Sequence, residues 1–389
     1  MNIAIDGRTI CQKQRGMPIY CDNLIWFLAL SRPADQFYIL INSVFEHNEP
    51  KNDYDRRLSR FRALANIHIV DIPSDGFMLW EQWLLPRAVK RLGIDLLHMP
   101  ANRICLTTRV PQIATMHDAM EWKGLQFPKF ALSKMRGWVY SVRKYLYVYL
   151  QYTVGLKRLK HIVTISGYSQ ADIVASFPAT RDKISYVYHG LPEMFANLSE
   201  PLPLAARKHV LMLGGESSHK NPHNMILAYA SLPLALREQY PLVIVGINPV
   251  HLDRFTRWIT EQAITDTCQL MTWVDEEALV DYFVHATALL FASVEEGFGF
   301  PLIQAMATGT PTVLSNAAVL LELSQGACEH AAHNDVAGLA AALQTLLSEP
   351  GYWIQKSAQM YQHSHAFTWD SSITKLSSIY AHKVLCHAE

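Results

Sequence analysis

Short apolar runs alternate with segments in which apolar residues recur at helical spacing, and this alternation continues along most of the chain. Each apolar run has the length of a buried strand. In the first half, strands are predicted at residues 2–6, 36–41, 67–72, 96–99, 111–116, 161–166 and 184–188. In the second half, strands are predicted at residues 209–213, 241–245, 268–273, 288–292 and 311–314. Strands that alternate with helices indicate a parallel, doubly wound sheet in each half, so the predicted fold class is α/β.

One stretch interrupts this alternation. Residues 196–207 contain prolines and polar positions without a clear period, which is typical of a connection between domains. We therefore predict a Rossmann-like N-terminal domain over residues 1–195 and a Rossmann-like C-terminal domain over residues 208–368. At 389 residues the chain is long enough for each domain to bury a core of its own.

The composition narrows the possible functions. Hydrophobic residues make up 50% of the chain and charged residues 17%, which is typical of a globular protein. The formal net charge is +0, so no overall field favours nucleic acid as a partner. The six cysteines show no Cys-x-x-Cys spacing, which disfavours a zinc site or a disulfide framework. Reduced thiols and an N-terminus without signal-peptide features predict a cytoplasmic protein.

The most informative stretch spans residues 291–315, at the end of a predicted strand. Two carboxylates, Glu295 and Glu296, precede a Gly-Phe-Gly turn, and Pro301 stands where a helix would begin. Backbone N–H groups at such a helix start, beside the carboxyl end of a parallel sheet, favour an anion such as a diphosphate. A carboxylate repels phosphate, so Glu296 is expected to face a hydroxyl-rich neighbour of the phosphate, such as a sugar. The alternative is that both glutamates are solvated charges beside a plain turn.

The segment Glu296-Gly-Phe-Gly-Phe-Pro-Leu-Ile-Gln304 resembles the signature of the family 4 retaining glycosyltransferases, in which seven residues separate two glutamates. The resemblance implies a GT-B architecture, with two Rossmann-like domains facing across a cleft, and a Glu296 that faces the donor sugar. It implies that the donor is also bound by Gly297, Phe298, Gly299, Phe300 and Gln304. Gln304 departs from the signature, because the family's second glutamate binds the ribose hydroxyls of the nucleotide. An amide oxygen accepts one such hydrogen bond but lacks the charge of a carboxylate.

A second loop, Gly214-Gly-Glu-Ser-Ser-His-Lys-Asn221, follows the strand predicted at 209–213. It resembles the glycine-rich loop of the same family, which ends in a basic pair, usually arginine and then lysine. The resemblance implies that Gly215, His219 and Lys220 bind the donor and that Lys220 neutralises its diphosphate. His219 replaces a permanent charge with one that titrates. The alternative for Lys220 is an ordinary solvated loop lysine.

Two further candidate residues lie in the first half. Gly16 precedes a predicted helix and resembles the glycine that brings the family's backbone close to the donor phosphates, but a tight turn explains it as well. His117 follows the strand predicted at 111–116, and the resemblance implies that this histidine faces the donor sugar. The alternative is a structural histidine whose tautomer is fixed by Asp118. The resemblance also implies that a C-terminal helix, predicted at residues 369–389, packs back on the N-terminal domain.

Residues 123–160 contain no acidic residue. Basic and aromatic residues alternate there, as they do in helices that lie on anionic membranes. The stretch holds Lys123, Lys129, Lys134, Arg136, Arg143, Lys144, Lys157, Arg158 and Lys160, together with Trp138, Tyr140, Tyr145, Tyr147, Tyr149 and Tyr152. Its apolar part, residues 145–156, is shorter than the ~20 residues that span a bilayer. Two interpretations remain: peripheral binding at the inner face of a membrane, and a solvated helix whose tyrosines pack on the core.

Together these observations predict a glycosyltransferase, and the resemblance implies that it retains configuration. It would move a hexose from GDP-mannose or a UDP-sugar to a hydroxyl of a glycan or lipid-linked acceptor, as in the assembly of surface polysaccharide or O-antigen by bacterial mannosyltransferase-like enzymes. Glu296, His117 and Lys220 are the expected catalytic residues. No cofactor or metal ion is expected, because no Asp-x-Asp pair is placed at the expected cleft. Two alternatives stay open, a sugar-nucleotide epimerase of GT-B fold and a sugar-nucleotide binding module without catalysis.

Overall fold

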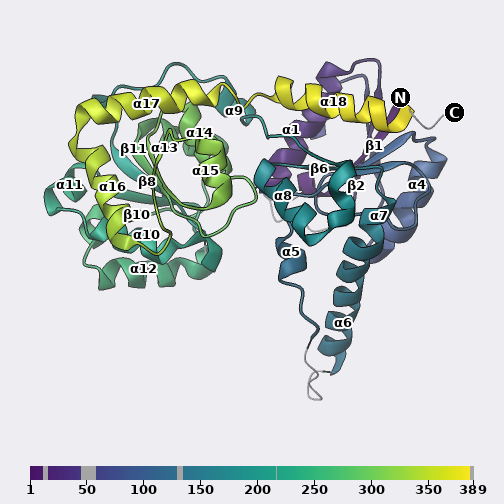
Figure 1. The fold of residues 1–389 in the computed structure, drawn as a ribbon, viewed down its shortest axis with the longest axis horizontal. Helices are drawn as coiled ribbons and strands as arrows, with labels where there is room; N and C mark the ends of the chain where they lie inside the picture. The colour runs from purple at the N-terminus through teal and green to yellow at the C-terminus, as the bar shows by residue number, and fades with distance from the viewer. Residues whose placement is uncertain (12–15, 45–57, 129–134, 216, 386–389) are drawn as a thin grey trace. The chain divides into compact units, whose positions relative to one another are not determined.

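The protein forms two compact units (Figure 1). The computed structural model describes residues 1–11, 16–44, 58–128, 135–215 and 217–385. The first unit comprises Met1–His189 and Trp369–Glu389, and the second comprises Gly190–Thr368. Each unit is built on one parallel sheet with helices packed against it.

The sheet of the first unit has seven parallel strands in the order β3-β2-β1-β4-β5-β6-β7. These strands are β1 Asn2–Asp6, β2 Gln36–Ile41, β3 Ile67–Asp71, β4 Leu96–Met99, β5 Gln112–Thr115, β6 His161–Thr164 and β7 Ile184–Tyr186. In the register, Ile3 of β1 lies between Phe37 of β2 and Leu96 of β4. The strands β4, β5 and β6 are buried throughout, which explains why they read as short runs with little alternation.

Helices cover this sheet, and the last of them comes from the C-terminus. The α-helices are α1 Gly16–Ser31, α3 Phe77–Leu79, α4 Leu85–Arg91, α5 Met120–Lys123, α6 Met135–Leu150, α7 Leu156–Arg158, α8 Gly167–Ser176 and α18 Trp369–Leu385. Two π-helical turns, η2 Trp80–Leu84 and η4 Gln151–Gly155, continue α3 and α6. The rings of Trp369 and Phe27 stack 5.5 Å apart and hold α18 against α1. The C-terminal helix therefore completes the core of the first unit.

The sheet of the second unit has six parallel strands in the order β10-β9-β8-β11-β12-β13. They are β8 His209–Leu213, β9 Leu242–Val245, β10 Cys268–Leu270, β11 Ala286–Phe291, β12 Thr312–Ser315 and β13 Glu329–Ala331. The α-helices are α9 Glu193–Ala196, α10 Pro222–Ala230, α11 Leu234–Gln239, α12 Leu252–Glu261, α13 Glu276–His285, α14 Phe300–Ala307, α15 Ala318–Ser324, α16 Val336–Ser348 and α17 Pro350–Ser364. A continuous apolar core joins β8, β9 and β11 to α10, α12 and α16.

The predicted fold class is confirmed, because both units are Rossmann-like with parallel sheets. Every predicted strand is present, with ends that differ by at most three residues. The sequence missed β13, which pairs with β12 at the edge of the sheet. Its residues, Glu329-His-Ala331, form no apolar run, because an edge strand is only partly buried.

The change from one unit to the other occurs before the predicted connection at residues 196–207. Phe195 of α9 packs edge-on against Phe283 of α13, with ring centroids 5.4 Å apart. The buried Arg207 guanidinium donates to the Thr308 carbonyl at 2.7 Å and to the Ala286 carbonyl at 3.1 Å. Residues 190–207 are therefore fixed to the second unit.

Candidate functional site

The order of the strands in the second sheet reverses between β8 and β11. From β8 the chain continues to β9 and β10 on one side, and from β11 it continues to β12 and β13 on the other. Open parallel sheets bind ligands at such a point, outside the carboxyl ends of the strands. The loops that leave β8 and β11 meet here, because the Val294 N–H donates to the His219 carbonyl at 2.7 Å. The two loops predicted to bind the donor are thus neighbours.

Lys220 and Glu296 form an ion pair between these loops. The Lys220 Nζ lies 2.8 Å from both Oε1 and Oε2 of Glu296. Only 9% of Glu296 is exposed, whereas the Lys220 side chain is 35% exposed. An ammonium group has three N–H donors, so Lys220 keeps donor capacity for an anion while it pairs with the carboxylate. The structure thereby joins two residues that the sequence assigned to separate motifs.

Two of the predicted glycines shape this pair and the helix beside it. Gly299 precedes α14 with a φ of +114°, and a Cβ there would lie 2.9 Å from Leu320 Cδ2, so both the backbone and the space require glycine. A Cβ on Gly215 would lie 2.6 Å from Lys220 Cγ. The bare backbone at Gly215 therefore lets the stem of Lys220 lie across the loop.

The other predicted donor residues of the β11 loop differ in how they are placed. Gly297 is half-buried, and the side chains of Phe298 and Phe300 are buried. The two phenyl rings pack edge-on at 5.6 Å, and Phe298 also contacts Phe367 at 6.4 Å. The rings therefore hold the loop in place, and the backbone is the part of these residues suited to contact a ligand.

Gln304 lies within α14 and is 4% exposed. Its backbone carbonyl accepts from the Thr308 N–H at 3.2 Å, as expected in a helix. Among the described residues, its side-chain amide has no hydrogen-bond partner. Because neither amide atom is fully enclosed, a bound molecule can reach the group and supply a partner.

Asn221 has a structural role that sequence reasoning missed. Its backbone is left-handed, with a φ of +56°, and its amide donates to the Ala292 carbonyl at 2.9 Å and to the His333 carbonyl at 2.6 Å. It thereby fastens the Lys220 loop to the β11 loop. One feature of the sequence could have indicated this role: Asn221 stands directly before Pro222, and asparagine tolerates a left-handed backbone conformation. His219 is half-buried one position before Lys220.

His117 lies in the first unit, just after β5. It is buried, and its Nε2 lies 2.8 Å from the Pro100 carbonyl, so Nε2 carries the proton and donates. Burial lowers the pKa of His117 to about 4, which keeps the ring neutral and leaves Nδ1 as an acceptor. Asp118 Oδ1 accepts from the Met120 N–H at 2.9 Å. Pro100 therefore sets the tautomer, which the alternative had assigned to Asp118.

A cluster of aromatic and histidine rings surrounds His117. The Tyr20 ring lies 5.1 Å from that of His117 and 4.5 Å from that of His189. His98 links the cluster to the C-terminal helix, with its Nδ1 2.5 Å from the Tyr380 hydroxyl and its Nε2 2.8 Å from Thr115 Oγ1. Burial lowers the pKa of His98 to about 3 and that of His189 well below its usual value. No local pattern in the sequence indicates this cluster, because its members come from distant parts of the chain.

Gly16 is the first residue of α1 and has a φ of +29°. No atom of the described residues would lie within 4 Å of a Cβ at this position. Its backbone conformation, and not crowding by the rest of the unit, accounts for glycine here.

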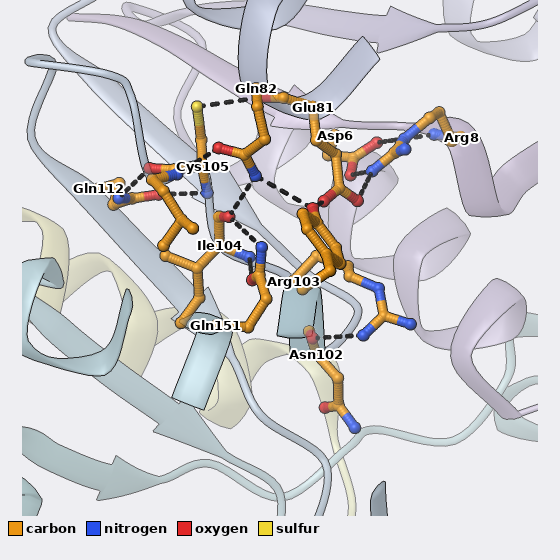
Figure 2. Close-up of polar contacts among 12 residues, drawn as sticks. Asp6, Arg8, Glu81, Gln82, Asn102, Arg103, Ile104, Cys105, Gln112 and Gln151 are labelled. Carbon is orange, nitrogen blue, oxygen red and sulfur yellow. Dashed lines mark hydrogen bonds and ion pairs between the residues drawn. The ribbon is translucent and has the colours of Figure 1, made fainter. Parts of the chain in front are cut away.

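Figure 2 shows a buried charge network in the first unit that the sequence did not predict. The Arg8 Nη2 donates to Asp6 Oδ2 and Glu81 Oε1, both at 2.6 Å, and the Tyr147 hydroxyl donates to Glu81 Oε2. Burial by itself would lower the pKa of Arg8, but the two carboxylates raise it. Burial also raises the pKa of Glu81, against the opposing effect of Arg8. The network ties the end of β1 to η2 and α6.

The described residues give two further findings on chemistry and topology. No three His, Cys, Asp or Glu side chains among them are grouped so that they could hold a metal ion. None of the helices in that part of the chain is both long and apolar enough to cross a bilayer.

Two family models match the chain, and the boundary between their matches lies close to the boundary between the two units. The family model described as Glycosyltransferase Family 4 matches residues 42–193, and the model described as Glycosyl transferases group 1 matches residues 197–366. The O-antigen chain mannosyltransferase B of Escherichia coli is 26% identical over 239 residues, which are 59% of this chain and 62% of that protein. The chain thus matches a little over three fifths of the length of this relative.

Solved structures resemble the whole chain at low sequence identity. WaaG, described as a glycosyltransferase involved in lipopolysaccharide biosynthesis, has a TM-score of 0.71 at 13% identity and matches 97% of this chain and 99% of its own. Alr3699/HepE of Anabaena, solved in complex with UDP and glucose, has a TM-score of 0.64 at 15% identity and matches 99% of both chains. At these identities the structures establish the fold alone.

The two family models match in chain order, one mainly in the first unit and one in the second. The chain therefore belongs to the glycosyltransferases of family 4 and group 1.

Proposed function

We propose that this protein is a retaining glycosyltransferase that moves a hexose from a nucleotide-diphosphate sugar to a hydroxyl of a glycan or lipid-linked acceptor. The observation that carries the proposal is the Lys220–Glu296 ion pair at the point where the strand order of the second sheet reverses. Such a point is where parallel sheets bind nucleotides, and the N-terminus of α14 adds backbone N–H groups beside it.

Lys220 is proposed to stabilise the leaving diphosphate. Negative charge grows on the phosphate oxygens as the bond to the sugar breaks, and a fixed ammonium group stabilises that charge without reorganisation. The Gly215 backbone leaves room for the lysine stem, so the ammonium is held at the loop surface. We propose that Lys220 and the α14 N-terminus together supply the positive charge and that transfer needs no metal ion.

Glu296 and His117 are proposed to hold the donor sugar. The Glu296 carboxylate is positioned by Lys220 and accepts hydrogen bonds from sugar hydroxyls. The neutral ring of His117 offers Nδ1 as an acceptor, because Nε2 is committed to Pro100. A double displacement requires two nearby carboxylates, and Gln304 does not provide the second. We therefore propose that acceptor attack occurs on the face from which the diphosphate departs.

The relatives favour particular substrates. The name of the Escherichia coli relative supports mannose as the sugar and O-antigen or a related surface polysaccharide as the product. The structural neighbour in complex with UDP and glucose supports a nucleotide sugar as the donor. GDP-mannose and UDP-hexoses are therefore the first donors to test.

The experiment is a panel of GDP-, UDP- and ADP-sugars, assayed for binding and for slow release of the sugar in the presence of EDTA. We expect one nucleotide class to bind and turn over, with a loss of about 10²- to 10³-fold in rate for Glu296→Ala. Glu295→Ala is the matched control, since it removes the neighbouring, less buried carboxylate. Equal turnover by Glu296→Ala and wild type would contradict the proposal. Binding without turnover would favour a binding module, and a product with an altered sugar would favour an epimerase.

A further inference from the structure

Helix α6 extends beyond the rest of the first unit (Figure 1). It carries exposed apolar side chains. Val139, Leu146 and Leu150 are 45%, 49% and 42% exposed. Their spacing of seven and then four residues places them on one face of the helix. Seven of the nineteen large apolar side chains that are exposed in the described part of the chain lie between Phe127 and Val154. Such a concentration marks an interaction surface rather than scattered surface residues.

Other residues of the basic stretch 123–160 pack within the fold and do not belong to this exposed surface. Tyr147 is buried and bonds Glu81, and the indole N–H of Trp138 donates to the Pro128 carbonyl at 3.1 Å. Lys123 forms an ion pair with Asp172 at 2.6 Å. These residues serve the fold, as one of the two sequence interpretations expected. Lys129 and Lys134 lie outside the described residues.

Cations and a second exposed segment adjoin the apolar face. Arg143 and Lys144 are exposed on α6, and the helix contains no acidic residue. The segment Phe77–Leu84 contacts α6, since the rings of Phe77 and Tyr147 lie 5.9 Å apart. Its side chains Leu79 and Trp83 are exposed. Apolar residues bordered by unopposed positive charge match the surface of an anionic bilayer.

We propose that the α6 surface, made of the apolar face of Val139, Leu146 and Leu150 together with the exposed Tyr140, Arg143 and Lys144 beside it, lies on an anionic lipid bilayer. The aliphatic and tyrosine side chains enter the interfacial region, and Arg143 and Lys144 contact lipid phosphates. A second copy of the chain is a poorer partner, because pairing through the same face brings the cations of both copies together. The inference rests on this surface and is independent of the proposed transfer reaction.

Cosedimentation with vesicles tests the proposal. The full-length protein should bind phosphatidylglycerol–phosphatidylcholine vesicles at low salt, bind them less at high salt, and leave pure phosphatidylcholine vesicles unbound. The variants Arg143→Glu/Lys144→Glu and Val139→Glu/Leu146→Glu should each lower the partition coefficient on the order of tenfold or more. Matched controls in the second unit are Lys208→Glu/Arg257→Glu and Val250→Glu/Ile354→Glu, whose side chains are also exposed. The controls should bind as wild type does.

Three results would overturn the proposal: no preference of the wild-type protein for anionic vesicles, equal losses in the α6 and control variants, or a dimer that Val139→Glu/Leu146→Glu dissociates without any vesicle binding. Thermal unfolding shows whether each variant is folded. The wild-type comparison of lipid composition and salt stands even if one variant fails to fold.

Discussion

At the scale of single residues, Lys220 has two roles that must be separated. It neutralises a Glu296 carboxylate that is almost fully buried, and a buried carboxylate without a counter-charge is costly. It is also the proposed partner of the donor diphosphate. Loss of activity in a Lys220 variant would therefore combine a displaced Glu296 with a lost phosphate contact. Glu296 and Gln304 are cleaner positions at which to test the site.

Gln304→Glu restores the carboxylate of the family signature at a buried position that has no hydrogen-bond partner among the described residues. Without nucleotide, we expect the free energy of unfolding to fall by about 1–3 kcal/mol, because a charge without a partner is placed at a mostly buried position. With nucleotide, the carboxylate can accept from ribose hydroxyls, so the ligand should stabilise the variant more than it stabilises wild type. Chemical denaturation with and without GDP or UDP measures both effects.

Gln304→Met is the control for this experiment, since it removes the amide without adding charge. If Gln304→Glu were as stable as wild type without nucleotide and gained no more from it, the ribose would have to bind elsewhere.

At the scale of elements, the sequence predicted what is local and missed what depends on the order of the strands. The buried strands were visible because their apolar runs are short and continuous, whereas β13 has none. The motifs located both donor loops, but the pairing of Lys220 with Glu296 depends on β8 lying beside β11. The contact between Arg8 and Glu81 joins residues 73 positions apart, and no local pattern signals it.

The start of α14 is expected to be sensitive to substitution of Gly299. Gly299→Ala places a Cβ 2.9 Å from Leu320 Cδ2 on a backbone with φ of +114°. We expect a loss of about 1–3 kcal/mol in the free energy of unfolding, together with weaker donor binding, because the helix start must shift. The control is Gly351→Ala, since a Cβ in this first turn of α17 would lie within 4 Å of no atom in the described part of the chain. Equal stability of the two variants, measured by urea denaturation, would show that the Gly299 loop adapts freely.

At the scale of the whole molecule, buried histidines make stability depend on pH. Burial lowers the pKa of His98 to about 3, and that of His117 in the first unit and His209 in the second to about 4. In the unfolded chain these groups titrate near 6.5. Above that pH both states are neutral. As the pH falls from 6.5 towards 4, only the unfolded state takes up protons, so the folded state loses stability.

We expect the free energy of unfolding, measured by urea denaturation, to be constant above pH 7 and to fall between pH 6.5 and 4, by about 1.4 kcal/mol per pH unit for each histidine that stays neutral in the folded protein. His117→Asn should make this slope shallower, because it removes a histidine whose pKa burial lowers to about 4. A midpoint that does not change between pH 7 and pH 5 would show that the histidines are protonated in the folded protein.

The Lys220–Glu296 site is proposed to direct transfer with retention of configuration. The most direct measurement is real-time NMR of the sugar that the protein releases or transfers from its preferred nucleotide sugar, with EDTA present. We predict that an α-linked donor first yields the α-anomer and that Glu296→Ala suppresses this product while Glu295→Ala does not. A β-anomer as the first product, or an α-anomer formed equally well by Glu296→Ala, would contradict the account.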